Sequence, residues 1–174
     1  PFWDHYWKNG ENDKLGWRLE YNMKHRGDVY ATHGLGPVAQ ALDIHRGDRM
    51  KTLVAMDTKS VVGKSLVEER TGQPCENFRN GDHTTTLIRT ENGKVIEIQH
   101  DVMTPQPYNR LYQLTGTKGF ANKYPIEGYA LDAKQLNASG VVPEVDNLNS
   151  HSFMPKKDME ALVQKYQHPI LKKY

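Results

Sequence analysis

Apolar and polar residues alternate most clearly between positions 84 and 103. Residues 84–90 are rich in β-branched side chains, and Ile96, Ile98 and Val102 share one face of a strand over 95–103. Between the two segments, Asn92-Gly93 is typical of a two-residue turn with positive φ. The pattern therefore predicts a β-hairpin.

Strand signals continue on both sides of this hairpin. Further strands are predicted over 50–56, 108–115, 120–124 and 128–131, with a turn over 116–119. The segment at 50–56 contains a continuous apolar run, which is typical of a buried strand. Since short turns join most of these strands, we expect a mainly antiparallel sheet.

Helical spacing of apolar residues marks the remaining elements. Helices are expected from near Gly36 to Arg46-Gly47, over 59–70 with Gly72 past the end, weakly over 18–26, and from Pro155 to before His168. Residues 1–17 and 137–152 favour loops. The order predicts an α+β domain, a mainly antiparallel open sheet with helices packed on one face. The other face would be free for another subunit, so we expect a homo-oligomer.

Composition narrows the class of protein. The chain has 174 residues and 37% hydrophobic content, which is enough for one domain with a core. Its net charge of +2 provides no basic field of the kind that nucleic-acid binding needs. No apolar run approaches the ~20 residues of a membrane-spanning helix, and Cys75 has no partner for an internal disulfide. Because the chain begins with Pro1, we expect it to be a fragment.

Candidate chemistry concentrates in residues 30–40. Tyr30, Thr32 and His33 come just before two glycines and a proline, so we expect them on an ordered loop at the start of a helix. Imidazole changes charge near neutral pH, and a nearby tyrosine hydroxyl could share a proton path. A purely structural role for His33 at a helix N-terminus explains the pattern equally well.

The same segment also matches a dinucleotide-binding pattern. Residues 34–39 read Gly-Leu-Gly-Pro-Val-Ala, and Asp57 follows at roughly the distance of a ribose-binding acid. The context disfavours this alternative, because the segment before Gly34 is polar and Pro37 stands where a backbone N–H should face a phosphate.

Other candidates give weaker signals. Asp82-His83 and His100-Asp101 offer metal-ligand residue types, but neighbouring strand residues face opposite ways, so no metal site is expected. Tyr108 follows two prolines and either presents its hydroxyl at the end of the sheet or packs. Neither a serine nucleophile elbow nor the close carboxylate pair of ordinary glycosidases can be identified.

Three stretches, 30–40, 104–110 and 114–119, resemble glycoside hydrolase family 109. This family of NAD-dependent α-N-acetylgalactosaminidase-like enzymes is a branch of the glucose-fructose oxidoreductase and inositol dehydrogenase superfamily. The resemblance covers most of residues 15–125 and is fainter after 137. It implies that residues 1–174 form a single substrate-binding and oligomerisation domain. The N-terminal Rossmann domain and the C-terminal end of the enzyme would be missing, and the fragment alone would be inactive.

The resemblance also implies roles for individual residues. Arg18, Tyr30, Thr32, His33 and Tyr108 match positions that bind substrate, and His33 and Tyr30 would be catalytic. Arg18 would orient the sugar, and Tyr108 would support acid–base chemistry and contact a hydroxyl. The sequence departs from the family at Ala31, where proline is usual, and this change could alter loop geometry and sugar preference.

The implied mechanism uses NAD, bound mainly by the missing Rossmann domain. The C3 hydroxyl of an N-acetylated sugar is oxidised, the C2 proton is removed, the glycosidic oxygen leaves, water adds and hydride returns to C3. Only proton transfers fall to the protein, so His and Tyr suffice. Two alternatives stay open: an NAD(P)-dependent sugar dehydrogenase of the same superfamily, and a non-catalytic assembly domain. Relatives of this type are often exported in bacteria, which makes a periplasmic or exported location one expectation.

Overall fold

The structure, a computed structural model, describes residues 16–134 and 148–173. Contacts divide the chain into two compact units, Pro1–Gln106 and Pro107–Tyr174. The loop expected over 1–17 lies almost wholly outside the described residues, as does most of the loop expected over 137–152. No helix in the described ranges is long and apolar enough to cross a membrane.

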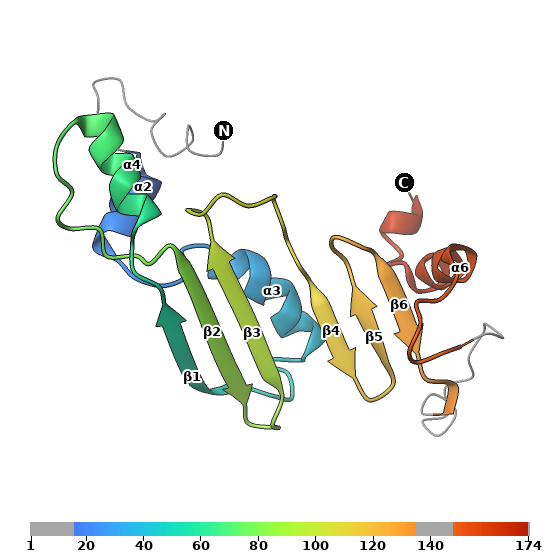
Figure 1. Ribbon diagram of the computed structural model, residues 1–174. Coiled ribbons are helices and arrows are strands. Elements are labelled where there is room, and N and C mark those ends of the chain that lie inside the picture. The colour runs from blue at the N-terminus through green and yellow to red at the C-terminus, as the bar shows by residue number, and fades with distance from the viewer. Residues whose placement is uncertain (1–15, 135–147, 174) are drawn as a thin grey trace. The chain divides into compact units, whose positions relative to one another are not determined.

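The first unit is built on a three-stranded antiparallel sheet. Strands β1 (Met50–Asp57), β2 (His83–Thr90) and β3 (Val95–Asp101) lie in the order β1-β2-β3 (Figure 1). In the register, Ile88 of β2 lies between Leu53 of β1 and Ile96 of β3. The predicted hairpin is therefore confirmed, and the sheet is antiparallel as expected.

The turn of this hairpin differs in detail from the prediction. Gly93 has a φ of +81°, as the sequence suggested, but Asn92 is not among the residues with positive φ. Thr90 N–H donates to the Lys94 carbonyl, so the loop covers residues 91–93 instead of Asn92-Gly93 alone. Such loops combine a type I turn with a left-handed glycine, which removes the need for positive φ at Asn92.

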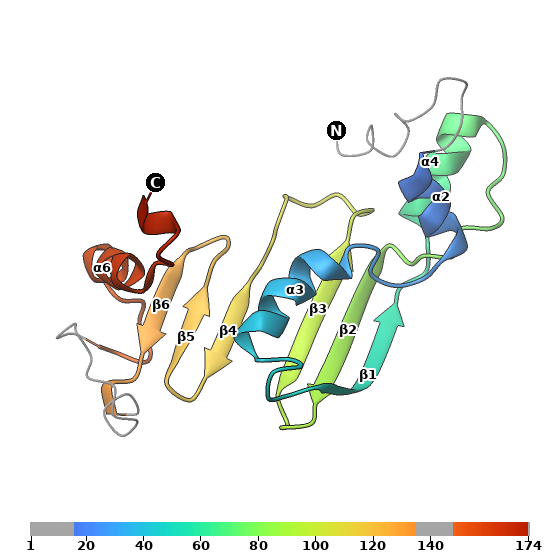
Figure 2. The ribbon, with the colours of Figure 1, turned by 180° about the vertical axis from the view of Figure 1, so that it is seen from behind.

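Helix α3 (Ala31–Ala41) lies across one face of this sheet and contacts β3 (Figure 2). On β2, the residues of that face are buried (Thr84, Thr86, Ile88 and Thr90), whereas Leu87 and Arg89 between them are exposed. The helix begins earlier than near Gly36 and ends before Arg46, so both predicted boundaries are wrong. The sequence Gly34–Ala39 is helical throughout.

A tight turn between α3 and β1 explains the early end of the helix. Asp43 and His45 have positive φ values of 56° and 63°, which a continuing helix does not allow. Buried Asp48 holds this turn, because its Oδ1 accepts the backbone N–H groups of Arg49 and Asn92 at 2.8 and 3.1 Å. Lys94 Nζ lies 3.2 Å from the other carboxylate oxygen and donates to the Leu42 carbonyl.

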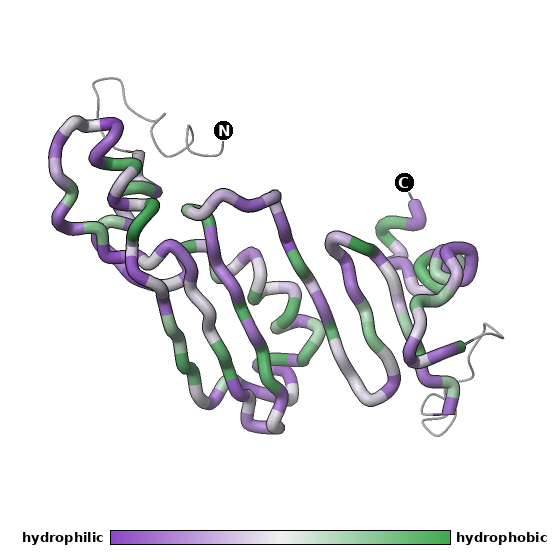
Figure 3. The backbone as a smooth tube through the Cα atoms, in the orientation of Figure 1, coloured by the Kyte–Doolittle hydropathy of each residue, from purple (hydrophilic) through white to green (hydrophobic). Residues whose placement is uncertain are grey.

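Strand β1 is exposed, which corrects the prediction of a buried strand at 50–56. The exposed fractions of Leu53, Val54 and Met56 are 61%, 63% and 75%, although Figure 3 shows hydrophobic residues along this strand. The reason is its place in the fold: β1 pairs only with β2 among the described strands, while α3 packs against β3. Neither face of β1 is therefore covered by the residues that the structure describes.

Helices α2 (Trp17–Lys24) and α4 (Val62–Thr71) lie together at one end of the sheet (Figures 1 and 2). Their core contains five buried residues, Leu19, Val67, Cys75, Phe78 and Met103. Asn80 Nδ2 donates to Asn22 Oδ1 at 2.6 Å inside this region, which ties α2 to the loop before β2. Gly72 ends α4 with a φ of +64°, in agreement with the predicted stop.

The second unit contains β4 (Gln113–Gly116), β5 (Gly119–Asn122) and β6 (Gly128–Leu131), again antiparallel in that order. Helix α6 (Lys156–Tyr166) contacts β6, begins after Pro155 as predicted, and is followed by a short 3₁₀ turn, Leu171–Lys173. The strand predicted over 108–115 is mostly wrong, because residues 105–112 have no regular structure after Pro105 and Pro107. The overall α+β class, with antiparallel sheets, is confirmed.

Candidate functional site

The first turn of α3 carries the side chains singled out from the sequence. Tyr30 is the residue immediately before the helix, and Thr32 and His33 lie in its first turn. The ring centroids of Tyr30 and His33 are 6.1 Å apart. Tyr30 is half-buried, whereas Thr32 and His33 are exposed. These residues were expected on a loop, so the structure brings them together but places the last two inside the helix.

Asp28 forms a turn with Tyr30 just before the helix. Its Oδ1 accepts the Tyr30 backbone N–H at 2.7 Å. A carboxylate just before a helix is favourable because it lies near the positive end of the helix dipole. Asp28 was not chosen from the sequence, although an Asx turn two residues before Tyr30 was a readable signal.

Glycines and proline shape the exposed side of the same turn. Pro37 lies inside α3 and lacks an N–H, so it cannot bond to the His33 carbonyl four residues earlier. A Cβ added at Gly34 or Gly36 would meet nothing within 4 Å among the described residues. The backbone beside His33 is therefore accessible, which suits the approach of a ligand.

A buried histidine from β3 completes the surroundings of Tyr30. The His100 ring lies 5.8 Å from the Tyr30 ring, and His100 Nε2 is 3.7 Å from Asp28 Oδ1. Burial lowers the pKa of His100, while the nearby carboxylates of Asp28 and Asp101 act in the opposite direction. The net direction favours a neutral imidazole. Sequence reasoning considered His100 only as a possible metal ligand, because nothing in the chain predicts its proximity to Tyr30.

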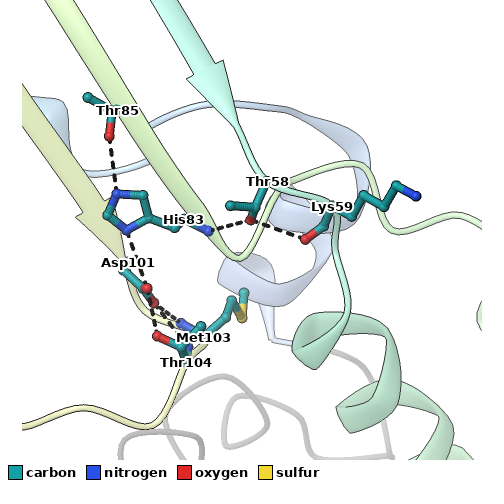
Figure 4. Close-up of polar contacts among 7 residues, drawn as sticks. All are labelled: Thr58, Lys59, His83, Thr85, Asp101, Met103 and Thr104. Carbon is teal, nitrogen blue, oxygen red and sulfur yellow. Dashed lines mark hydrogen bonds and ion pairs between the residues drawn. The ribbon is translucent and has the colours of Figure 1, made fainter.

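Asp101, next to His100, organises the end of β3 (Figure 4). Its oxygens accept the backbone N–H groups of Met103 and Thr104 and the Thr104 hydroxyl, and His83 Nδ1 lies 3.4 Å away. Desolvation raises the pKa of Asp101, but these hydrogen bonds outweigh it and the pKa is lowered. Asp101 thus fixes the position of Thr104, the first residue of the stretch 104–110, by hydrogen bonds. No cluster of three or more metal-ligating side chains occurs among the described residues.

Arg18 and Tyr108, the other two predicted site residues, lie on different parts of the chain. Arg18 is on α2, where its guanidinium stacks 4.5 Å from the Trp17 ring. Tyr108 belongs to the second unit and is 59% exposed. There, Arg110 lies 5.4 Å over the Tyr108 ring, and the Tyr124 hydroxyl donates to the Tyr108 carbonyl at 2.9 Å. Arg18 is half-buried, and neither residue belongs to the first turn of α3.

The dinucleotide-binding alternative for Gly34–Ala39 does not fit the fold. A phosphate loop needs a buried strand, a glycine turn and then a helix whose first N–H groups are free. Here both glycines lie within α3, and the following strand β1 is antiparallel to its neighbour β2. The described residues therefore contain no phosphate loop at this position.

Comparison with known proteins assigns the chain to a protein family. Residues 5–174 match the family described as "Glycosyl hydrolase 109, C-terminal domain". The chain belongs to this family. A glycosyl hydrolase family 109 protein of Phocaeicola vulgatus is 84% identical over 174 residues, which is 100% of this chain and 34% of that protein. Family 109 proteins of Porphyromonas gingivalis and Bacteroides thetaiotaomicron are 56% and 55% identical, over 97% and 98% of this chain and 34% and 35% of their own lengths.

The family membership confirms the resemblance drawn from residues 30–40, 104–110 and 114–119. The chain spans about a third of the length of these curated relatives. It therefore corresponds to the C-terminal domain of a glycosyl hydrolase family 109 protein.

Proposed function

We propose that this chain is the sugar-binding domain of an NAD-dependent glycosidase that cleaves N-acetylgalactosaminides. The observation that carries the proposal is the first turn of α3, where exposed His33 stands beside Tyr30 in a chain of family 109. An imidazole and a phenol in accessible positions suit proton transfer to and from a sugar. Proton transfer by these two groups does not need a pair of catalytic carboxylates.

The cofactor would be held mainly outside this chain. The glycine pattern that suggested a dinucleotide site lies within α3, so this stretch does not fit a phosphate-binding role. In this proposal the sugar site faces a cofactor that another domain supplies. When bound, NAD supplies reversible oxidation at the sugar C3, and this chain supplies binding, orientation and proton transfer.

Each residue then has a role that matches its environment. His33, exposed on α3, would move a proton near the C3 hydroxyl or the leaving oxygen. Tyr30 would support this transfer, and the Thr32 hydroxyl would hydrogen-bond to the sugar. Arg18, whose guanidinium lies over the Trp17 ring, would orient the substrate, and the exposed Tyr108 would contact a hydroxyl.

The test uses the full-length gene product, because the fragment alone is expected to be inactive. It is incubated with an aryl α-N-acetylgalactosaminide while aryl release and NADH absorbance are followed together. Aryl release without NADH accumulation is the expected result, since hydride returns to C3 in each turnover. NADH accumulation on the free sugar without bond cleavage would instead assign a sugar dehydrogenase, and failure to bind sugar would favour an assembly domain.

We also propose that the sheet face opposite α3 contacts a second copy of the protein. On this face Val54 is paired with Leu87, and their exposed fractions are 63% and 47%, with Met56 further along β1 at 75%. Exposed apolar side chains clustered on one face mark an interaction surface. The sequence analysis also expects a homo-oligomer that forms through the free face of the sheet.

A further inference from the structure

His100 is buried beside Tyr30 and has no role in the proposed chemistry. Its side chain is 8% exposed, and its Nε2 has no hydrogen-bond partner among the described residues. A buried polar atom without a partner is costly, by roughly 1–3 kcal/mol, so its retention in a packed site calls for an explanation. The Asp28 carboxylate lies near this atom, and the Tyr30 ring lies near the His100 ring.

These contacts link one strand to the start of α3. Asp28 Oδ1 is both the acceptor of the Tyr30 N–H and the oxygen that lies 3.7 Å from His100 Nε2. The rings of His100 and Tyr30 are 5.8 Å apart and tilted by 47°, within the range of favourable aromatic contacts. His100 therefore contacts Tyr30 directly and also reaches it through Asp28.

We propose that His100 is a positioning residue that fixes Tyr30 for sugar binding and turnover, acting from β3 through the Tyr30 ring and the Asp28 carboxylate. This inference rests on the proposed glycosidase function. His100 does not itself touch the sugar in this proposal. It sets the position of the residue that does, and a misplacement of about 1 Å in such a residue can lower the rate about a hundredfold.

The register of the sheet supplies a matched control. Thr84 of β2 lies opposite His100 and is also buried, and its hydroxyl has no hydrogen-bond partner among the described residues. Thr84→Val therefore changes a buried polar group on the same face without removing a hydrogen bond that its hydroxyl makes among the described residues. Because an unpaired hydroxyl is replaced by a methyl group, we expect the fold to tolerate it.

The experiment uses the full-length enzyme and an aryl α-N-acetylgalactosaminide, at a temperature where all variants remain folded by circular dichroism. His100→Leu should lower kcat/KM by about 10- to 100-fold, whereas Thr84→Val should stay within about twofold. His100→Gln, whose amide can donate toward Asp28, should recover most of the loss. The double variant His100→Leu/Asp28→Asn should lose little more than the worse single variant, because both act through Tyr30.

Two results would overturn the inference. The first is an active parent enzyme in which His100→Leu keeps kcat/KM within about twofold, which would make His100 a packing residue only. The second is a double variant whose losses multiply, because independent effects would exclude a shared action through Tyr30. A parent that neither binds nor cleaves the sugar would instead overturn the proposed function, and the role of His100 in sugar binding with it.

Discussion

At the scale of single residues, the start of α3 combines groups with different solvent access. His33 is exposed, Tyr30 is half-buried, and His100 is buried beside Tyr30. An exposed side chain contributes little to folding, so His33 can be changed with a clear kinetic result. A buried group such as His100 needs a control for packing, which Thr84 provides.

We predict that His33→Ala in the full-length protein lowers kcat for the aryl glycoside by about 100-fold or more, because a positioned acid–base group contributes about 10²–10⁴. The unfolding temperature should change little, since the side chain is exposed. Steady-state kinetics and thermal unfolding provide the two measurements.

The matched control for this prediction is His45→Asn. It also removes an exposed imidazole, and asparagine tolerates the positive φ of 63° at this position. Its turnover should equal that of the parent. If His33→Ala also stayed within a few-fold of the parent, His33 should be dropped as the catalytic residue.

Asp48 gives a prediction that depends on pH. Desolvation raises its pKa, but hydrogen bonds from Asn92, Thr90, Arg49 and Lys94 outweigh this effect and lower the pKa to about 2. Because the value is lowered on folding, the stabilisation is complete above the unfolded pKa of about 3.9 and is lost as the pH falls toward 2. Asp48→Asn should therefore destabilise the turn at pH 7 and make little difference near pH 2.

Hydrogen exchange of residues 43–49 and 90–94 measures this local effect. At pH 7, these amides should exchange faster in Asp48→Asn than in the parent, and the ratio should shrink in acid. A ratio that did not depend on pH would show that the carboxylate charge is not the stabilising feature. Asp43→Asn is the control, since Asp43 is exposed and its Oδ1 lies 3.4 Å from the similarly exposed Arg46.

At the scale of secondary-structure elements, side chains from other parts of the chain set where helices begin. Asp82, which precedes β2, accepts the backbone N–H groups of Val61, Val62 and Gly63 at 2.8, 2.9 and 3.0 Å. The free N–H groups at the start of α4 are thus satisfied by a residue far along the chain. The start of α3 has no such side-chain cap, and Asp28 accepts only the N–H of Tyr30, the residue before that helix.

We predict that Asp82→Ala destabilises the first unit by about 1–3 kcal/mol, because buried N–H groups lose their acceptor. Asp82→Asn should lose less, since its amide oxygen still accepts hydrogen bonds. Denaturant unfolding of the full-length protein, followed by hydrogen exchange in residues 61–66, locates the effect. Equal stability of the alanine variant and the parent would contradict the proposed cap.

At the scale of the whole molecule, the exposed apolar residues of β1 and β2 are the basis of the proposed contact with a second copy. Leu53 and Val54 are neighbours on β1 with similar exposed fractions of 61% and 63%, but they lie on opposite faces of the sheet. Leu53 lies on the face of buried Ile88, and Val54 lies on the face of exposed Leu87. Substituting Leu53 and Val54 one at a time therefore tests the two faces of the sheet separately.

We predict that Val54→Glu weakens self-association of the full-length protein by about a hundredfold, since it buries an unpaired charge in the proposed interface. Leu53→Glu should leave association unchanged, because its face is not the proposed one. Light scattering over a range of concentrations measures both. A loss of association in Leu53→Glu alone would place the interface on the face that carries α3.

The positions of most elements could be predicted from local patterns, and the errors have physical causes. The hairpin, the Gly72 helix end and the helix after Pro155 depend on side-chain period, glycine and proline, which act locally. The end of α3 depends on the turn at 43–48, and the apolar run of β1 suggested burial that the described residues do not provide.

The sequence by itself determined the residue types of the site, because Tyr30, Thr32 and His33 lie within one helical turn and carry the family resemblance. Only the tertiary structure decided what surrounds them. His100 reaches Tyr30 because the antiparallel register places it on the face of the sheet that carries α3, and no spacing along the chain encodes that contact. The physical reason is general: hydrogen-bonding and helical period act over a few residues, whereas packing joins residues far apart in sequence.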